Sequence, residues 1–122
     1  MKITSFNPLI ASRDPEAVIA LFEALGFERH HTKEGISDMN ITGVRMKDPN
    51  GLYVDVANGD FPGDRTLIRM NVDDLEEAVE RLTARGFRKA GNFRETEETP
   101  SSRFNIMISP TGFILNVIQH IK

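Results

Sequence analysis

The chain has 122 residues, of which 15 are Lys or Arg and 18 are Asp or Glu; its formal net charge of −3 and the lack of a basic run argue against nucleic-acid binding. It has no cysteine, which excludes disulfides, thiolate metal sites and a cysteine nucleophile. The length fits one domain over residues 1–122. No apolar run approaches the ~20 residues that span a bilayer, so we expect a cytoplasmic protein without a membrane partner.

The first half of the sequence predicts a strand, a helix and three further strands. The first strand is expected over residues 5–12 and the helix over Asp14–Phe27. Asp14 is placed to cap the helix, Pro15 suits its first position, and Gly26 suits its left-handed stop. Apolar residues that recur at helical spacing predict a buried stripe of Val18, Leu21, Phe22 and Leu25. Strand candidates follow over residues 28–33, 39–47 and 52–58.

The second half repeats this pattern, with Asp74 and Gly86 at the cap and the stop of a helix over Asp74–Phe87. Its buried stripe is expected to be Leu75, Ala78, Val79 and Leu82. Strands are expected over residues 66–72, 87–92, 104–109 and 113–121. The polar segment Asn92–Arg103 is expected to be a solvated loop or a lid over a site. The chain therefore divides into two βαβββ modules, module one over 1–59 and module two over 66–122, joined by a linker over 60–65.

Two closing hairpins turn at "DPNG" and "SPTG", where the Gly suits a left-handed position after a type I turn. Counting back from the turns places Arg45 opposite Asp55 and Ile106 opposite Asn116. Alternation then gives each module a face covered by its helix and a helix-free face. The covered faces are expected to hold Phe6, Ile10, Val44, Met46, Val54 and Val56 in module one, and Ile68, Met70, Val72, Met107, Phe113, Leu115 and Val117 in module two.

The helix-free faces of the two modules differ in character. In module one the expected residues are Asn7, Leu9, Ala11, Gly43, Arg45, Tyr53, Asp55 and Ala57. In module two they are Leu67, Arg69, Asn71, Phe104, Ile106, Ile108, Ile114, Asn116 and Ile118. Because the second set is largely apolar, this face is expected to line a pocket or to meet another subunit.

This order of elements, with helices ending in "LGF" and "RGF" and the paired "DPNG" and "SPTG" hairpins, resembles the vicinal oxygen chelate superfamily, also called the glyoxalase/bleomycin-resistance/dioxygenase superfamily. The resemblance covers nearly the whole chain. It implies an α+β fold in which two tandem βαβββ modules form a curved mixed sheet, an open barrel around a cavity, with the helices on the outer face. It also implies a homodimer.

Enzymatic members of that superfamily hold a divalent metal with a His or Gln early in each first strand and a Glu in each last strand. By this resemblance the four ligand slots fall on Asn7, Asp55, Leu67 and Asn116. Transition metals prefer imidazole and carboxylate ligands, whereas this set offers one carboxylate, two amides and a leucine. We therefore expect no tightly bound divalent metal and no other cofactor, although a hydrated Mg²⁺ or Ca²⁺ is conceivable.

Several other polar residues are candidates for ligand contacts. Arg45 is expected to form an ion pair with Asp55 or to orient a polar ligand, and Arg69 either binds a carboxylate or phosphate or faces solvent or an interface. Tyr53 can stack on a ligand or donate to it. Strand alternation puts His30 and His31 on opposite faces, so they cannot share a metal ion. His120 lies roughly 13 Å along its strand from Asn116, at ~3.3 Å per residue.

The leading hypothesis is a small protein that has lost the metal ligands and binds a partly apolar molecule without chemistry, as the bleomycin-resistance branch does. The residues expected to line its cavity are Asn7, Arg45, Tyr53, Asp55, Leu67, Arg69, Phe104, Ile106 and Asn116; no catalytic residue is predicted. Two alternatives remain open. One is a metal-dependent enzyme of the glyoxalase (lactoylglutathione lyase) or extradiol dioxygenase type, recruiting His31 or His120. The other is a catalytically silent interaction module.

Overall fold

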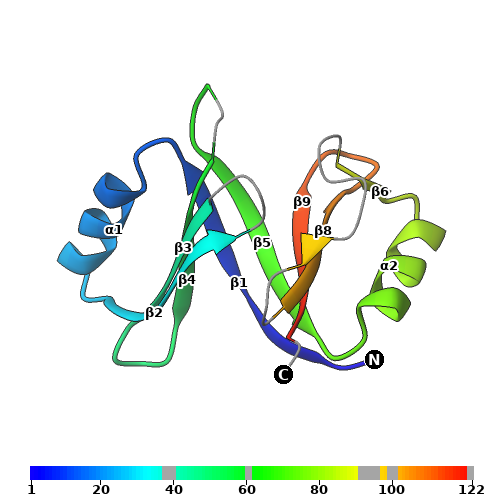
Figure 1. Cartoon of the computed structure of the whole chain (residues 1–122), viewed down its shortest axis with the longest axis horizontal. Helices are drawn as coiled ribbons and strands as arrows, with labels where there is room; N and C mark the ends of the chain where they lie inside the picture. Colours follow the sequence, from blue (N-terminus) through cyan, green and yellow to red (C-terminus); the bar gives the residue numbers. More distant parts are fainter. Residues whose placement is uncertain (37–40, 60–61, 91–96, 99–101, 121–122) are drawn as a thin grey trace. The chain divides into compact units, whose positions relative to one another are not determined.

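The computed structural model describes residues 1–36, 41–59, 62–90, 97–98 and 102–120 (Figure 1). It confirms two successive βαβββ modules, the second of which has one additional short strand, β7. The first module consists of β1 (Ile3–Ser12), α1 (Pro15–Ala24), β2 (Glu28–Ile36), β3 (Ile41–Lys47) and β4 (Tyr53–Asn58). The second consists of β5 (Arg65–Val72), α2 (Leu75–Ala84), β6 (Arg88–Lys89), β7 (Glu97–Glu98), β8 (Ser102–Ile108) and β9 (Ile114–His120). Within the described part of the chain, neither helix has the length and apolar character needed to cross a membrane.

The chain forms two compact units that follow the modules with one exchange. The α1 unit comprises Asn7–Thr66, and the α2 unit comprises Met1–Phe6 together with Leu67–Lys122. The start of β1 thus belongs with the second module, and two hydrogen bonds fix it there: the Lys2 amide donates to Asp73 Oδ1 at 2.6 Å, and the Asp73 amide donates to the Lys2 carbonyl at 3.1 Å.

Strand order is the same in the two modules. In the α1 unit the order is β2-β3-β4-β1, with β1 and β4 parallel and the other pairs antiparallel. In the α2 unit β5 pairs in parallel with β9, β9 pairs with β8, and both short strands β6 and β7 pair with β8. Each leading strand therefore lies directly beside the last strand of its own module, which brings their side chains together.

The α1 helix begins and ends as the sequence predicts, but it buries a different stripe. Asp14 Oδ1 accepts from the Ala17 amide at 3.3 Å, and Gly26 ends the helix with φ of 105°. Ile19 is 1% exposed, whereas Leu21 is 54% exposed, so the expected stripe was wrong in part. Residues 17–22 read "AVIALF", an almost uninterrupted apolar run that fits several overlapping stripes. Docking on the sheet selects Val18, Ile19 and Phe22 and leaves Leu21 and Leu25 outside.

In the α1 unit, α1 lies beside the strands in Figure 1, and the hydrophobic core lies between α1 and one face of these strands. The buried set is Ile19, Val44, Met46, Val54 and Val56, with Ile10, Val18, Phe22 and Phe27 packed against it. This confirms the predicted covered face except at Phe6, which is 61% exposed. Phe6 belongs to the part of β1 that groups with the α2 unit, so α1 does not cover it.

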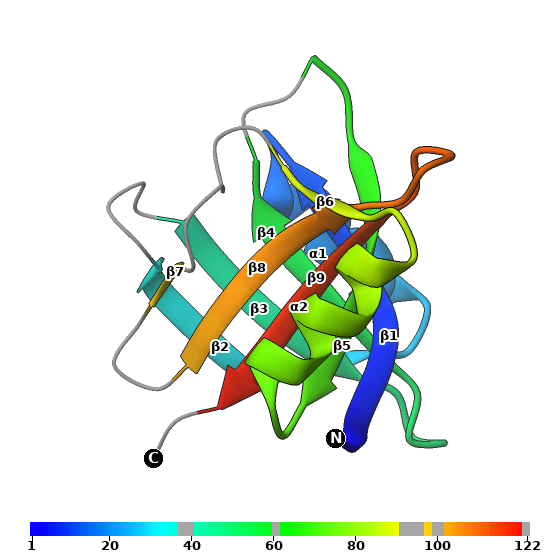
Figure 2. The ribbon, with the colours of Figure 1, turned by 90° about the vertical axis from the view of Figure 1, so that its right-hand side faces the viewer.

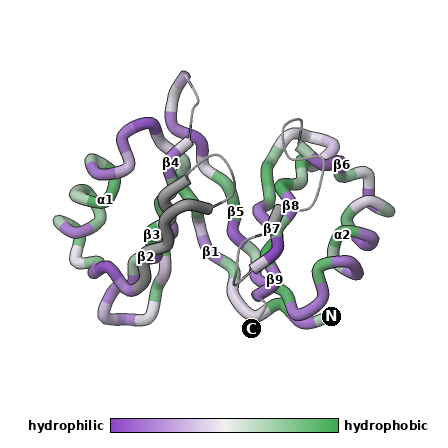
Figure 3. The backbone as a smooth tube through the Cα atoms, viewed as in Figure 1, coloured by the Kyte–Doolittle hydropathy of each residue, from purple (hydrophilic) through white to green (hydrophobic). Residues whose placement is uncertain are grey.

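The α2 unit has the corresponding core, and Figure 2 shows α2 lying over β8 and β9. Its buried set is Met70, Val72, Leu75, Ala78, Met107, Leu115 and Val117, which confirms the predicted stripe and covered face. Phe113 is 51% exposed at the end of the hairpin and meets Phe87 edge to face at 5.5 Å. The side of α2 away from the strands is hydrophilic in Figure 3.

Both hairpins have the predicted register, since Arg45 pairs with Asp55 and Ile106 with Asn116. A side-chain oxygen fixes each turn. Asp48 Oδ1 accepts from the amides of residues 50 and 52, and Ser109 Oγ accepts from those of residues 111, 112 and 113. The turn glycine after the Asp48 hairpin has φ of 86°, the left-handed region that glycine adopts without strain. The turns thus set which residues face each other on the helix-free faces.

Candidate functional site

A polar cluster occupies the helix-free face of the α1 unit. Asn7 on β1 and Asp55 on β4 are 7% and 3% exposed. Because these strands are parallel and Leu9 pairs with Asp55, Asn7 lies within reach of the carboxylate. Its Nδ2 donates to Asp55 Oδ2 at 2.5 Å and to the Pro8 carbonyl at 2.9 Å. The two predicted ligand slots of module one are therefore hydrogen bonded to each other.

Arg45 completes this cluster from β3. Its Nη2 donates to Asn7 Oδ1 at 3.3 Å, and its Nη1 lies 3.8 Å from Asp55 Oδ2, which confirms the predicted ion pair. The Tyr53 ring lies under the guanidinium, with Arg45 Cζ 4.2 Å from the ring centroid. A buried carboxylate is costly unless it is paired and hydrogen bonded. Here Asp55 forms an ion pair with Arg45 and accepts a hydrogen bond from Asn7, both in the α1 unit.

The slot residues do not fit a transition metal. Asp55 Oδ2 and Asn7 Oδ1 are already engaged, by the Asn7 amide nitrogen and by Arg45, and a guanidinium 3.8 Å from the carboxylate repels a dication. In module two, Leu67 has no donor atom and is 7% exposed. Among the described residues, no three His, Asp or Glu side chains lie together as a metal site would require.

The α2 unit presents a different helix-free face, centred on Asn116 of β9. Asn116 is paired with Arg69 on one side and Ile106 on the other. Its Oδ1 is buried and accepts no hydrogen bond from the described residues. An unmet buried acceptor costs about 1–3 kcal/mol. The second-module slot therefore holds an acceptor that suits a hydrogen-bond donor on a bound molecule.

Apolar residues accompany Asn116 on this face of β8 and β9. Ile118 pairs with Phe104 across the two strands, and the next pair on the same face is Ile106 with Asn116. Phe104, Ile118 and Leu67 are each 7% exposed. The face thus joins one unmet acceptor and a nearby cation, Arg69, to an aliphatic and aromatic wall, which is the usual composition of a small-molecule site.

A hydrogen-bonded chain of three side chains follows on the same face. Arg69 Nε donates to Asn71 Oδ1 at 3.0 Å, and Asn71 Nδ2 lies 3.1 Å from His120 Nε2. Because Oδ1 must be the acceptor for Arg69, Nδ2 donates to His120, whose Nε2 is therefore unprotonated with its lone pair engaged. This nitrogen cannot also bind a metal, which argues against recruitment of His120 as a ligand.

The position of His30 could not be predicted from strand alternation. A register shift between Arg29 and His31 makes β2 irregular there, and the His30 ring meets Tyr53 edge to face at 5.9 Å. Lys47 Nζ lies 5.6 Å from the same Tyr53 ring centroid. These two contacts were missed because a bulge leaves no signature in a short polar strand. The side chain of His31 lies outside the described residues, as does most of Asn92–Arg103, in which β7 was not predicted.

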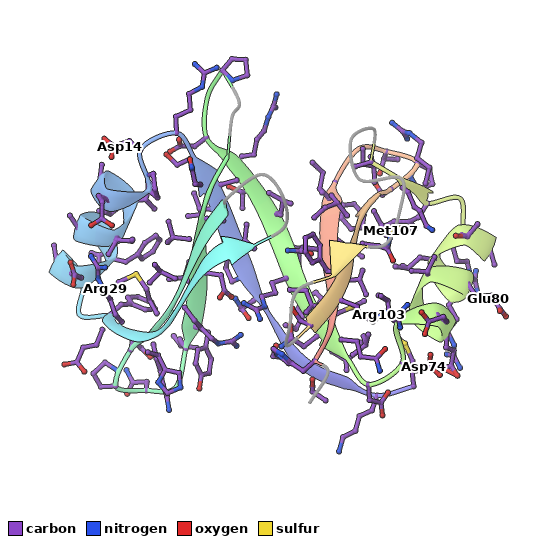
Figure 4. All side chains as sticks on the ribbon, viewed as in Figure 1. Asp14, Arg29, Asp74, Glu80, Arg103 and Met107 are labelled. Atoms are coloured by element: carbon purple, nitrogen blue, oxygen red, sulfur yellow. The ribbon has the colours of Figure 1, made fainter. Side chains whose placement is uncertain are left out.

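The outer, helix-covered sides carry ordinary surface pairs. Arg29 Nη2 bonds Glu16 Oε1 at 3.0 Å, and Arg103 Nη2 bonds Glu76 Oε2 at 2.6 Å; Figure 4 labels both arginines. The Arg103 hydrogen bond lowers the pKa of Glu76 below its ordinary value. An open crevice of about 220 Å³ lies here, lined by Leu75, Glu76, Val79, Glu80, Lys89 and Asn105. It is smaller than the ~300–1,000 Å³ of typical ligand sites, and none of the predicted site residues lines it.

Comparison with solved structures identifies the fold of this chain. The sequence matches no family model and no curated protein. Solved structures do match. Methylmalonyl-CoA epimerase from Mycobacterium tuberculosis is 18% identical with a TM-score of 0.71, covering 98% of this chain and 90% of that one.

Two further structures are similar over nearly their full lengths. A glyoxalase/bleomycin resistance protein/dioxygenase superfamily member from Vibrio splendidus is 18% identical with a TM-score of 0.62, over 98% of this chain and 100% of that one. Streptomyces coelicolor methylmalonyl-CoA epimerase, solved with 2-nitronate-propionyl-CoA, is 16% identical with a TM-score of 0.66, over 99% and 100%. The chain therefore has the vicinal oxygen chelate fold, the fold of the glyoxalase/bleomycin resistance protein/dioxygenase superfamily.

Proposed function

We propose that this protein binds a small, partly apolar molecule on the helix-free face of its α2 unit without a tightly bound metal. The observation that carries the proposal is the buried Asn116 Oδ1, which no donor among the described residues reaches and whose residue pairs with Ile106 on one side and Arg69 on the other. A ligand that donates one hydrogen bond to this oxygen and packs on the apolar wall would satisfy an acceptor that the described residues leave unmet.

The arrangement of the first-module slot supports the absence of metal from this function. The Asp55 carboxylate is charge-balanced by Arg45 and hydrogen bonded by Asn7. A metal at this position would have to displace Arg45 and break the contacts of Asp55 Oδ2 and Asn7 Oδ1. In this proposal the polar cluster of Asn7, Arg45 and Asp55 has a structural role within the α1 unit.

A thermal-shift screen of small metabolites and antibiotics tests the proposal, because any ligand that binds only the folded state raises the melting temperature. Each compound is screened with EDTA and with added divalent metal. The proposal predicts stabilising compounds whose effect is unchanged by EDTA. It further predicts that Asn116→Leu reduces the shift, while Asn58→Leu, at an exposed position at the end of β4, leaves it unchanged. If every stabiliser requires metal, the proposal is wrong.

An enzymatic function is the second candidate, because two of the similar structures are methylmalonyl-CoA epimerases. In its metal-dependent form it predicts turnover of a hemithioacetal or a catechol that a chelator abolishes. The third candidate, a catalytically silent interaction module, predicts self-association or capture of a partner through the apolar face. It is excluded if the protein stays monomeric at high concentration and binds small molecules there.

A further inference from the structure

The α1 unit carries a second group of side chains whose chemistry points to a particular ligand class. Two cations and a histidine, Arg45, Lys47 and His30, gather around the single tyrosine of the sequence, Tyr53. Their distances to the ring centroid are 4.2, 5.6 and 5.9 Å, measured from Arg45 Cζ, Lys47 Nζ and the His30 ring centroid. None of these contacts carries the function proposed above.

The donors of this group point to a phosphate more than to a carboxylate. Arg45 binds carboxylates best with its two-pronged edge, but that edge is already used, since Nη2 donates to Asn7 and Nη1 lies near Asp55. The remaining donors are separate points: the Lys47 ammonium, a His30 ring nitrogen and the Tyr53 hydroxyl. Separate donors around a centre suit an anion with three oxygens and a charge of about −1.5 to −2.

Acidic groups on the same face reduce the positive electrostatic potential of Arg45, Lys47 and His30. Asp55 is buried and occupied by Asn7 and Arg45. Glu28 is the cross-strand neighbour of Lys47 in the register of β2 and β3. Lys47 nevertheless lies over the Tyr53 ring, so its ammonium is directed to the centre of the group. Glu28 should weaken anion binding without blocking it.

We propose that the helix-free face of β2, β3 and β4 binds the phosphate group of a small phosphate ester. Lys47 and His30 contact the phosphate oxygens, Arg45 adds charge from the wall, and Tyr53 holds the cations in place and packs on the organic part of the ester. Exposed Lys47 and His30 at the edge of the group admit the anion from solvent. The buried Arg45–Asp55–Asn7 cluster fixes the base of the site.

Titration with phenyl phosphate, followed by NMR of the His30 and Tyr53 rings and by calorimetry, tests this site, with benzyl alcohol as the neutral probe. Lys47→Gln and His30→Gln should each weaken phenyl phosphate binding, Lys47→Gln by about tenfold, which is 1.4 kcal/mol. Glu28→Gln should tighten it. Lys89→Gln, at an exposed lysine of β6 in the α2 unit, is the matched control and should leave the affinity unchanged. Added salt should weaken binding.

Three results would overturn the site: no binding of phenyl phosphate or inorganic phosphate, equal loss of affinity in Lys47→Gln and Lys89→Gln, or equal binding of benzyl alcohol and phenyl phosphate. All four positions varied here are exposed, so the variants should fold, and their urea midpoints check this. A metal-independent ligand whose effect depends on Asn116 would still support the function proposed above after any of these outcomes. The two proposals therefore fail separately.

Discussion

Removal of Arg45 should be far more damaging than removal of an arginine on the outer side of the same unit. At 3.8 Å from Asp55, and at the effective dielectric of ~20 that suits protein pairs, the guanidinium contributes about 4 kcal/mol of attraction. The side chains of Arg45 and Asp55 are only 15% and 5% exposed. Arg45→Met removes this cation from beside a buried carboxylate, so we expect a loss of about 3–5 kcal/mol in the free energy of unfolding.

The matched control is Arg29→Met. Arg29 lies on β2 in the same unit and bonds Glu16 at 3.0 Å, but these side chains are 42% and 71% exposed. Exposed pairs contribute about 0–1 kcal/mol. Urea unfolding followed by circular dichroism measures both variants, since the free energy is the midpoint multiplied by the m-value. The double variant Arg45→Met/Asp55→Leu should recover most of the loss, because it removes the buried charge together with its partner.

Equal midpoints for Arg45→Met and Arg29→Met would refute this reasoning. So would a double variant that is no more stable than Arg45→Met. Either result would mean that solvent reaches the Asp55 carboxylate and that Asn7 and Arg45 do not shield it from water.

Three further predictions concern the helices and the α2 unit. Ile19→Ala should lower the free energy of unfolding by about 2–5 kcal/mol, whereas Leu21→Ala should change it by no more than about 0.5 kcal/mol. Equal losses in urea unfolding would contradict the burial of Ile19 and the exposure of Leu21. Arg103 lowers the folded-state pKa of Glu76, so Glu76 adds stability that is present above pH 4.5 and lost as the pH falls through the lowered pKa. Because Glu76 is 65% exposed, Glu76→Gln should lower the free energy of unfolding by under about 1 kcal/mol at pH 7. This loss, measured from urea midpoints, should shrink as the pH falls through the lowered pKa. Long-range ¹H–¹⁵N NMR at neutral pH should find the His120 proton on Nδ1; a proton on Nε2 would contradict the Asn71 hydrogen bond.

The register of the closing hairpins could be predicted because turn chemistry fixes it. The "DPNG" and "SPTG" turns set the count, and the pairs Arg45–Asp55 and Ile106–Asn116 followed from it. The ion pair was predicted for the same reason. The hydrogen bond from Asn7 to Asp55 was not, because it depends on the parallel pairing of β1 with β4 across 48 residues of sequence.

Two other features escaped prediction because tertiary packing decides them. In α1, four consecutive apolar residues from Val18 to Leu21 fit more than one stripe, and contact with the sheet chooses Ile19. In β2, the register shift before His31 places His30 beside Tyr53, whereas strict alternation gives no reason for that contact. Both are places where local pattern leaves several arrangements of similar energy.

The central claim of this account is the proposal that the protein functions without a metal at Asn7, Asp55, Leu67 and Asn116. Elemental analysis of the purified protein, prepared without chelator and then dialysed against zinc, nickel, iron and manganese in turn, tests this claim directly. The account predicts no stoichiometric metal after each dialysis and a melting temperature that EDTA does not change. One equivalent of tightly held zinc, nickel or iron, with a melting temperature that falls on its removal, would contradict it.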